Sequence, residues 1–172
     1  NPTKLSQPLD FLPDALYAPG CDDRGDTTED LLSQAAKTAQ EAEIAVIFAG
    51  LPDRYESEGF DRADMKMPDG QLRMIDAVAA ANPNTVVVLL CGSAVECPWA
   101  DRVKGILYMG LPGQAGGEAV ADLLCGRANP SGKLAESWPL SYADVPSSEI
   151  YGKTDDALYQ EGVYVGYRYY DK

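Results

Sequence analysis

Residues 44–51 read Ile-Ala-Val-Ile-Phe-Ala-Gly-Leu, an almost unbroken apolar run. Two further runs, at residues 86–91 and 106–109, have the same character. A strand with one solvent-exposed face alternates apolar and polar residues, whereas the strands of a parallel sheet that is covered on both faces are continuously apolar. The three runs therefore predict three strands of a parallel sheet that are buried on both faces.

Segments with helical periodicity separate these predicted strands. A helix capped by Thr27 or Thr28 precedes the first strand, a second spans about 69–81, and a third spans about 114–125. The side chains expected on their buried faces are Leu31, Leu32, Ala35, Ala39 and Ala42, then Leu72, Ile75 and Ala79, then Ala119, Val120, Leu123 and Leu124. This alternation predicts an α/β fold: a doubly wound, mostly parallel sheet with helices on both faces.

The pattern changes after Asn129, where Pro and Tyr become frequent. Short strand candidates remain at residues 134–138 and 163–170. We therefore expect an α/β domain over residues 1–140. Residues 141–172 are then a Tyr-rich tail that wraps this domain or leads to a following one.

Composition excludes several classes of function. Lys and Arg number 14 against 27 Asp and Glu, so the net charge of −13 would repel nucleic acids and anionic membranes. The sequence contains no histidine, which excludes histidine-based triads and histidine-ligated zinc within this chain. Carboxylates must therefore carry any acid–base chemistry, and we expect no cofactor.

The four cysteines, at positions 21, 91, 97 and 125, show no CxxC spacing, and we expect them to be reduced. No apolar run approaches the ~20 residues of a membrane span. Residues 1–10 also lack a signal pattern. Together these features predict a soluble, cytoplasmic location, although a signal removed earlier would leave no trace.

Ligands of open α/β sheets bind at the loops that leave the carboxyl ends of the strands. The loop after the first predicted strand contains Asp-Arg-Tyr-Glu-Ser-Glu-Gly-Phe-Asp-Arg, residues 53–62. Such a stretch is either a solvated acidic loop or a functional loop on a rigid scaffold. It lacks the D-x-[DN]-x-[DN]-G spacing of a calcium loop, so no metal site is predicted.

A glycine-rich segment, residues 110–118, follows the third predicted strand and opens a helix. This context resembles a phosphate cradle. However, the glycines do not match G-x-G-x-x-G, no G-K-[ST] follows, and Glu118 would repel a phosphate. The sequence favours a tight structural turn.

Four segments taken together carry a resemblance that spans nearly the whole chain. Residues 50–62, followed by Met67-Pro68 and Gln71, resemble the acid/base loop of glycoside hydrolase family three, the β-glucosidase and β-xylosidase family. Residues 91–101 resemble its G-S-x-V-E-x-P-W-A motif. Its strongest signature is matched by Leu-Pro-Gly-Gln-Ala-Gly-Gly at 111–117 with residues 129–139, and residues 159–169 complete the series.

The resemblance implies an α/β sandwich that lies beside a (β/α)8-type barrel, with sugar bound between them. It assigns Glu58 as the catalytic acid/base and places the nucleophilic aspartate in the barrel. The expected activity is retaining hydrolysis of terminal β-linked glucose from oligosaccharides or glucosides, with β-glucosidase favoured over β-xylosidase. The chain alone should then be inactive. The alternative is a non-catalytic carbohydrate- or nucleotide-binding module.

The same resemblance gives structural expectations for other parts of the chain. Family sandwich domains usually begin with a strand upstream of the segment that resembles residues 1–5, so we expect the sheet to lack its first strand within this chain. Another chain would supply that strand, or the 172 residues are part of a longer molecule. The remaining motif residues are expected to shape the loops. Asp61 and Arg62 should form an ion pair, and Glu96 and Asp101 should be structural carboxylates. Trp99 is expected to pack rather than to stack on sugar, and Tyr55 and Phe60 to anchor the loop rather than to line a leaving-group subsite.

Overall fold

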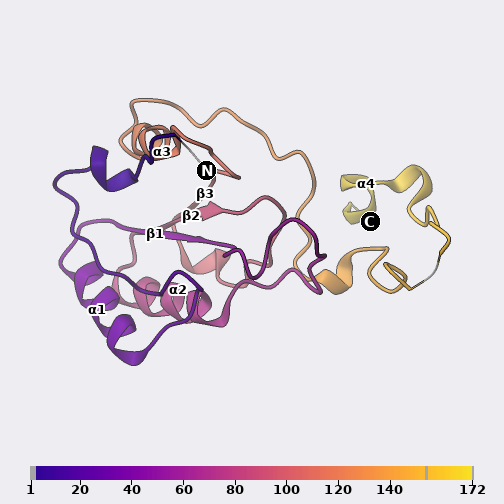
Figure 1. Cartoon of the computed structure of the whole chain (residues 1–172), viewed down its shortest axis with the longest axis horizontal. Helices are drawn as coiled ribbons and strands as arrows, with labels where there is room; N and C mark the ends of the chain where they lie inside the picture. Colours follow the sequence, from indigo (N-terminus) through magenta and orange to yellow (C-terminus); the bar gives the residue numbers. More distant parts are fainter. Residues whose placement is uncertain (1–2, 154, 172) are drawn as a thin grey trace.

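A parallel sheet forms the centre of the computed structural model, which describes residues 3–153 and 155–171 (Figure 1). None of the described helices is long and apolar enough to cross a bilayer. With η marking a 3-10 helix, the elements are η1 (Pro8–Phe11), α1 (Glu29–Gln40), β1 (Ala45–Gly50), α2 (Asp69–Ala81), β2 (Thr85–Leu90), η2 (Ala100–Arg102), β3 (Gly105–Tyr108), α3 (Gly116–Leu124), η3 (Tyr142–Asp144), η4 (Gly162–Tyr164) and α4 (Tyr167–Tyr170).

The three strands lie in the order β1-β2-β3 and are parallel, as the apolar runs predict. In the register, Val46 is opposite Val86, and Val87 is opposite Ile106. Helix α2 makes the crossover from β1 to β2, which a parallel pair requires. Among the described residues, no strand pairs with the outer edge of β1.

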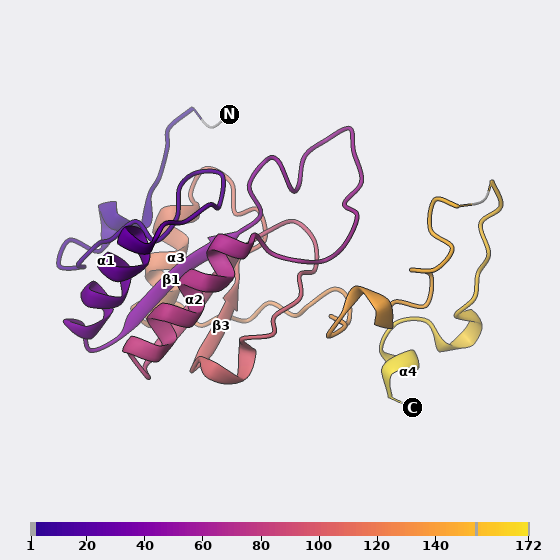
Figure 2. The ribbon, with the colours of Figure 1, turned by 90° about the horizontal axis from the view of Figure 1, so that it is seen from below.

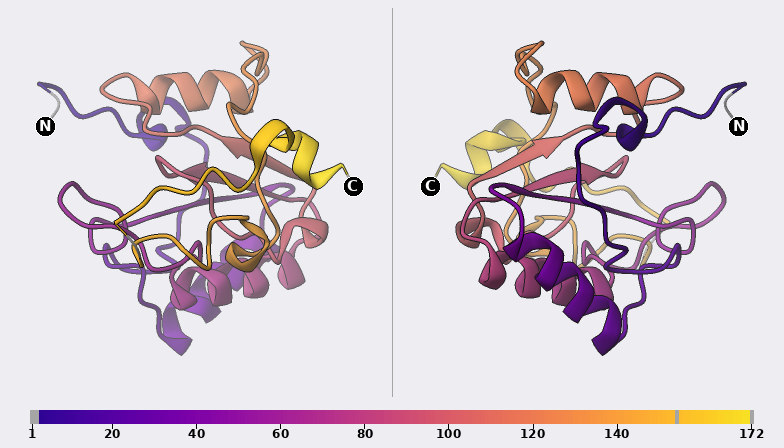
Figure 3. Two further views of the ribbon diagram at one scale, coloured as in Figure 1. Left: turned by 90° about the vertical axis from the view of Figure 1, so that its right-hand side faces the viewer. Right: turned by 90° about the vertical axis from the view of Figure 1, so that its left-hand side faces the viewer.

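Helices cover both faces of the sheet, but unequally: α1 and α2 lie on one face and α3 on the other (Figure 3). Side chains of β1 alternate, with Ile47 buried but Val46 and Phe48 each 37% exposed. Strand β2 is buried along nearly its whole length, whereas β3 is not. The expectation of burial on both faces is therefore right for β2 and wrong for β1 and β3. Val46 and Phe48 of β1 lie on the face that the single short helix α3 covers only in part. The exposed residues of β3, Ile106 and Tyr108, pair in register with Val87 and Leu89 and so lie on the other face.

The predicted helices are present, with corrections to their buried faces. Helix α1 is capped as expected by Thr28, whose Oγ1 accepts a hydrogen bond from Leu31 N at 3.3 Å. In α3, Ala119 is exposed, which contradicts its predicted burial, because this helix packs on one side only. The apolar side chains buried in these helices are Leu32, Ala35 and Ala39 in α1, Met74, Ile75 and Val78 in α2, and Val120 and Ala121 in α3.

The tail contains no strand at residues 134–138 or 163–170, contrary to the sequence prediction. The second candidate instead forms η4 and α4, with Gly166 between them at a φ of +68°. Tyrosine and valine favour strands only where a neighbouring strand offers backbone partners, and no strand pairs with this segment in the described chain. The tail lies beyond the carboxyl ends of the strands (Figure 1).

Candidate active site

Two loops gather at the carboxyl edge of the sheet, where β1 and β2 end (Figure 2). The acidic loop, residues 51–66, makes up most of the connection from β1 to α2, which begins at Asp69. The β2 loop, residues 91–99, joins β2 to η2. Parallel strands bring their carboxyl ends to the same edge, so motifs 40 residues apart in sequence become neighbours.

The base of the acidic loop is fixed to buried structure. Gly50 N donates to Oε1 of the buried Gln71 at 2.9 Å, and Leu51 N donates to Leu90 O at 3.2 Å. A Cβ on Gly50 would lie 1.9 Å from Leu90 O, so only glycine allows this approach of the two strands. Pro52 O then accepts hydrogen bonds from the backbone N–H groups of Tyr55 and Glu56, at 2.7 and 3.1 Å, which turns the chain sharply.

Glu56 ties the acidic loop to the β2 loop through both carboxylate oxygens. Its Oε2 accepts from Gly92 N at 2.7 Å, and its Oε1 accepts from Ser93 Oγ at 2.6 Å. Arg62 reaches the same place, since its Nη1 donates to Ser93 Oγ at 2.9 Å and to Ala94 O at 3.0 Å. Bonds of this kind, with one charged partner, are stronger than neutral ones.

Glu58 lies in the sequence between Glu56 and Arg62, which fix the acidic loop to the β2 loop, but its own side chain is not fixed in this way. It is exposed, as are its neighbours from Ser57 to Asp61. Gly59 adopts a φ of +97°, and nothing lies within 4 Å of where its Cβ would be. Neither a hydrogen bond nor an ion pair joins the Glu58 carboxyl to the part of the chain that the structure describes. The carboxyl is therefore presented outward and unpaired.

The expected Asp61–Arg62 ion pair is not formed, which is a correction. The Arg62 guanidinium turns inward to the β2 loop, where a hydroxyl and a backbone carbonyl accept from it, and Asp61 stays exposed. The ion pair that does hold the acidic loop joins Arg54 to Asp26, at 2.6 Å. Hydrogen bonding to Arg54 holds the pKa of Asp26 below its ordinary value.

The aromatic residues of the two loops divide by burial. Trp99 is fully buried, so the packing role predicted for it is confirmed. Tyr55 is half-buried, with the Arg54 guanidinium 5.2 Å from its ring centre. Phe60 is 50% exposed and does not anchor the loop as expected, because the segment that carries it extends away from the sheet.

Of the two carboxylates expected to be structural, Glu96 has that role. Its Oε1 accepts from Tyr142 N at 2.8 Å, and its own N–H donates to Met65 O at 2.8 Å. Glu96 thus links the end of the acidic loop to the start of the tail. Asp101 is exposed in η2 and lies outside this network.

The glycine-rich segment is a turn covered by the N-terminal segment. Gly113 has a φ of +70°, and a Cβ on Gly117 would lie 2.6 Å from the backbone of Gln7. Gln114 Oε1 accepts from Thr3 N at 3.0 Å and from Thr3 Oγ1 at 2.6 Å. Protein backbone therefore occupies the space against the start of α3 where a phosphate would sit.

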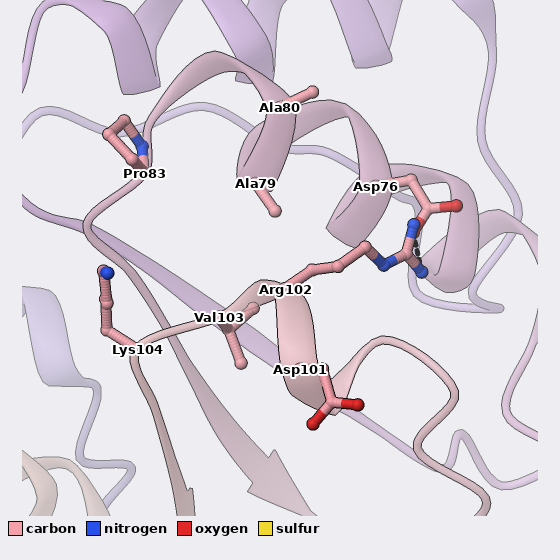
Figure 4. A pocket seen from close by; sticks show the side chains of 8 residues that line it. All are labelled: Asp76, Ala79, Ala80, Pro83, Asp101, Arg102, Val103 and Lys104. Carbon is pink, nitrogen blue, oxygen red and sulfur yellow. Dashed lines mark ion pairs between the residues drawn. The ribbon is translucent and has the colours of Figure 1, made fainter.

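Two other kinds of site receive no support at this edge. No group of three or more His, Cys, Asp or Glu side chains in the described chain is placed to hold a metal ion. A hollow of about 380 Å³ lies at the opposite edge, where Arg102 pairs with Asp76 at 2.7 Å (Figure 4). Lys104 and Pro83, which line it, precede β3 and β2, so the hollow is remote from the acidic loop.

Sequence reasoning singled out Glu58 as the candidate acid/base but did not predict the contacts that hold its loop. Glu56, Arg62 and Ser93 converge across 31 and 37 residues of sequence separation. The one available signal was the Gly-Ser pair that directly follows the second apolar run, because polar groups at a strand end face the neighbouring loop.

Comparisons with known proteins agree with the motifs. The chain is 54% identical over 144 residues to the thermostable β-glucosidase B of Acetivibrio thermocellus, covering 83% of this chain and 19% of that protein. It is 47% identical over 178 residues to an exo-α-(1→6)-L-arabinopyranosidase of Bifidobacterium breve, covering 99% of this chain and 24% of that protein. The chain thus spans about a fifth to a quarter of the length of these relatives.

The fold agrees as well. The crystal structure of a Bifidobacterium adolescentis GH3 β-glucosidase superposes with a TM-score of 0.91 at 45% identity, covering 99% of this chain and 26% of that one. A Kluyveromyces marxianus β-glucosidase in complex with glucose gives 0.77 at 36% identity, covering 83% and 17%. Residues 1–167 match the family described as glycosyl hydrolase family 3 C-terminal domain. With sequence, fold and loop motifs in agreement over nearly its whole length, the chain belongs to the C-terminal domain family of glycosyl hydrolase family 3.

Proposed function

We propose that this chain is the acid/base-supplying domain of a retaining β-glycosidase of the β-glucosidase type, with Glu58 as the catalytic acid/base. The observation that carries the proposal is the placement of Glu58. Its carboxyl is exposed and unpaired on a loop that is anchored on both sides, at the carboxyl edge of the sheet. A carboxyl that must reach a substrate held mainly by another domain requires such a position.

Glu58 would act twice in the reaction. As an acid it gives its proton to the glycosidic oxygen while a nucleophilic carboxylate attacks the anomeric carbon. As a base it then takes a proton from the water that releases the sugar. Retaining hydrolysis requires two carboxyls about 5 to 5.5 Å apart. Glu56 does not fit the second role, because both of its oxygens accept hydrogen bonds from the β2 loop. The resemblance to the family instead implies that the nucleophile is an aspartate of a (β/α)8-type barrel in the rest of the enzyme.

Replacement of Glu58 by alanine in the complete enzyme tests the role directly. We expect kcat/KM for glucosides with poor leaving groups to fall about 10² to 10⁴-fold, the usual contribution of a positioned proton donor. Aryl glucosides with acidic phenols need less protonation as they leave, so their first step should suffer much less. Added azide should then speed release of the sugar as a β-glycosyl azide, because the carboxylate that would repel the anion has been removed.

The exposed Glu43, remote from the loops, supplies the matched control. Glu43→Ala should leave rates and leaving-group dependence unchanged. If Glu58→Ala retained the wild-type rate on poor leaving groups, the acid/base assignment would be refuted, and a non-catalytic binding module would become the better description.

A second candidate substrate class comes from the Bifidobacterium breve relative, whose name specifies an exo-α-(1→6)-L-arabinopyranosidase. An L-arabinopyranoside lacks the hydroxymethyl group of a glucoside, and the same acid/base could serve either sugar. Hydrolysis of nitrophenyl β-D-glucoside and nitrophenyl α-L-arabinopyranoside by the complete enzyme distinguishes them. A higher kcat/KM on the arabinoside would replace β-glucosidase as the proposed activity without changing the role of Glu58.

A further inference from the structure

We propose that Ser93 is a positioning residue whose hydroxyl fixes the tip of the acidic loop, residues 57–61, so that the Glu58 carboxyl is aimed at the glycosidic oxygen. This inference rests on the proposed function of Glu58. Ser93 itself lies on the β2 loop, and it acts on the tip through Glu56 and Arg62.

The geometry joins both ends of the tip to a single atom. Ser93 Oγ donates its one proton to Glu56 Oε1 at 2.6 Å and accepts from Arg62 Nη1 at 2.9 Å. Glu56 directly precedes the tip and Arg62 directly follows it. The hydroxyl therefore lies between a carboxylate and a guanidinium, and the three side chains close the five-residue tip into a ring.

Strand β2 makes this anchor rigid. Its last residues lead into Cys91, which is fully buried, and Gly92 brings the backbone against the loop. A Cβ on Gly92 would lie 3.2 Å from Leu111 Cδ1 and 3.3 Å from Glu56 Oε1, so a side chain at this position would press on the Glu56 carboxylate. The second bonds of the two charged side chains, from Gly92 N to Glu56 and from Arg62 to Ala94 O, lie on either side of Ser93.

Within the described chain, nothing else holds the Glu58 carboxyl. The tip is exposed throughout, and the surroundings of Gly59 are empty. Both Oγ contacts would be lost in Ser93→Ala, leaving Glu56 and Arg62 with one backbone contact each. A misplacement of a catalytic group by about 1 Å can cost on the order of 10²-fold in rate. The direction of Glu58 should therefore depend on the Ser93 hydroxyl.

The test uses Ser93→Ala in the complete enzyme, assayed on a series of glucosides with increasingly poor leaving groups. We expect kcat/KM to fall roughly 10- to 100-fold for the poorest leaving groups and much less for acidic phenols, because proton donation is impaired. Azide should not rescue this variant, since the Glu58 carboxylate is still present to repel the anion. Ser93→Thr, which keeps a hydroxyl, should recover most of the loss, and Ser33→Ala on the exposed face of α1 should behave as wild type.

Glu56→Gln provides a second variant if Ser93→Ala does not fold, and it should show the same leaving-group dependence without azide rescue. Wild-type behaviour of Ser93→Ala on poor leaving groups would overturn the inference, and so would an equal loss on all substrates, which indicates a merely structural role. Failure of the underlying function is recognised separately, because then Glu58→Ala itself shows no leaving-group dependence. Rescue of Glu56→Gln by azide would assign the acid/base to Glu56 and overturn both.

Discussion

Single residues differ in chemistry according to burial, and the four cysteines illustrate this. All four are free thiols in the structure. Burial raises the pKa of Cys91 and of Cys97 to about 11, whereas Cys125 is exposed. Only the thiolate reacts with alkylating agents. At pH 8 the thiols of Cys91 and Cys97 therefore carry very little of the reactive form.

Native alkylation of the chain at pH 8 should therefore label Cys125 first and Cys91 and Cys97 last, as followed by mass spectrometry over time. Denaturation without reductant should then allow all four to react, whereas two intact disulfides would refute the expectation of reduced thiols.

The free energy of unfolding depends on the pKa values of the same two thiols, those of Cys91 and Cys97. The pKa values of Cys91 and Cys97 in the folded chain lie above the unfolded value of about 8.5, so their contribution to the free energy of unfolding is fully present below that pH. It should decline as the pH rises to about 11.

The candidate site could be predicted from sequence only where residues are adjacent in the chain. The Glu-Gly-Phe-Asp-Arg order pointed to Glu58, because a motif records local order. The same adjacency suggested an Asp61–Arg62 ion pair, and this was wrong. Arg62 instead bonds to Ser93, 31 residues away, and that contact is set by the packing of β1 beside β2. Long-range partners of this kind leave no periodic signal.

At the scale of elements, the strands were the most predictable feature and the tail the least. Runs of aliphatic and β-branched residues favour strands wherever neighbouring strands can pair with them, so β1, β2 and β3 were all found although β1 and β3 are not buried on both faces. The helix faces were less accurate, as with Ala119, because a helix is buried only where another layer reaches it. Tail residues such as Tyr159, which is 95% exposed, have strand propensity without a strand to pair with.

The buried side chain of Asn82 links the end of α1 to the connection between α2 and β2. This link gives a prediction at the scale of elements. Its Nδ2 donates to Ala39 O at 2.8 Å and to Ala42 O at 2.9 Å, and its Oδ1 accepts from Asn84 N at 2.8 Å. Alanine at this position would remove all three of these hydrogen bonds from a buried site, at a cost of about 2 kcal/mol.

Hydrogen exchange in the complete enzyme measures this cost locally. With Asn82→Ala, amides of α2 and β2 that exchange by local opening should exchange roughly 30-fold faster, the equivalent of about 2 kcal/mol. Asn84→Ala is the matched control, because its exposed side chain makes one bond, to Glu43 O at 3.2 Å. Equal acceleration by both substitutions would show that Asn82 is not the joint between these elements.

At the scale of the whole molecule, the chain exposes apolar side chains at several places. Val46 and Phe48 lie on the sheet face that α3 only partly covers, and Tyr159 and Val163 are largely exposed in the tail. Extended apolar surface on a folded domain marks contact with other protein surface. This agrees with the proposal that the chain works as one domain of a larger glycosidase, and with its match to only 19–24% of the length of two related enzymes.

The isolated 172-residue chain should therefore show no turnover of an aryl β-glucoside, even at concentrations where the complete enzyme is readily assayed. The chain supplies Glu58, but Glu56 is held by Gly92 and Ser93 and cannot serve as a nucleophile about 5 to 5.5 Å away. Circular dichroism must first show that the chain is folded, because inactivity of an unfolded chain says nothing about its carboxylates. Hydrolysis by the pure folded chain that disappears in Glu58→Ala would place a complete catalytic pair within these residues and refute the two-domain proposal. Hydrolysis that survives Glu58→Ala would instead indicate a contaminating enzyme, which a second purification of the same variant would remove.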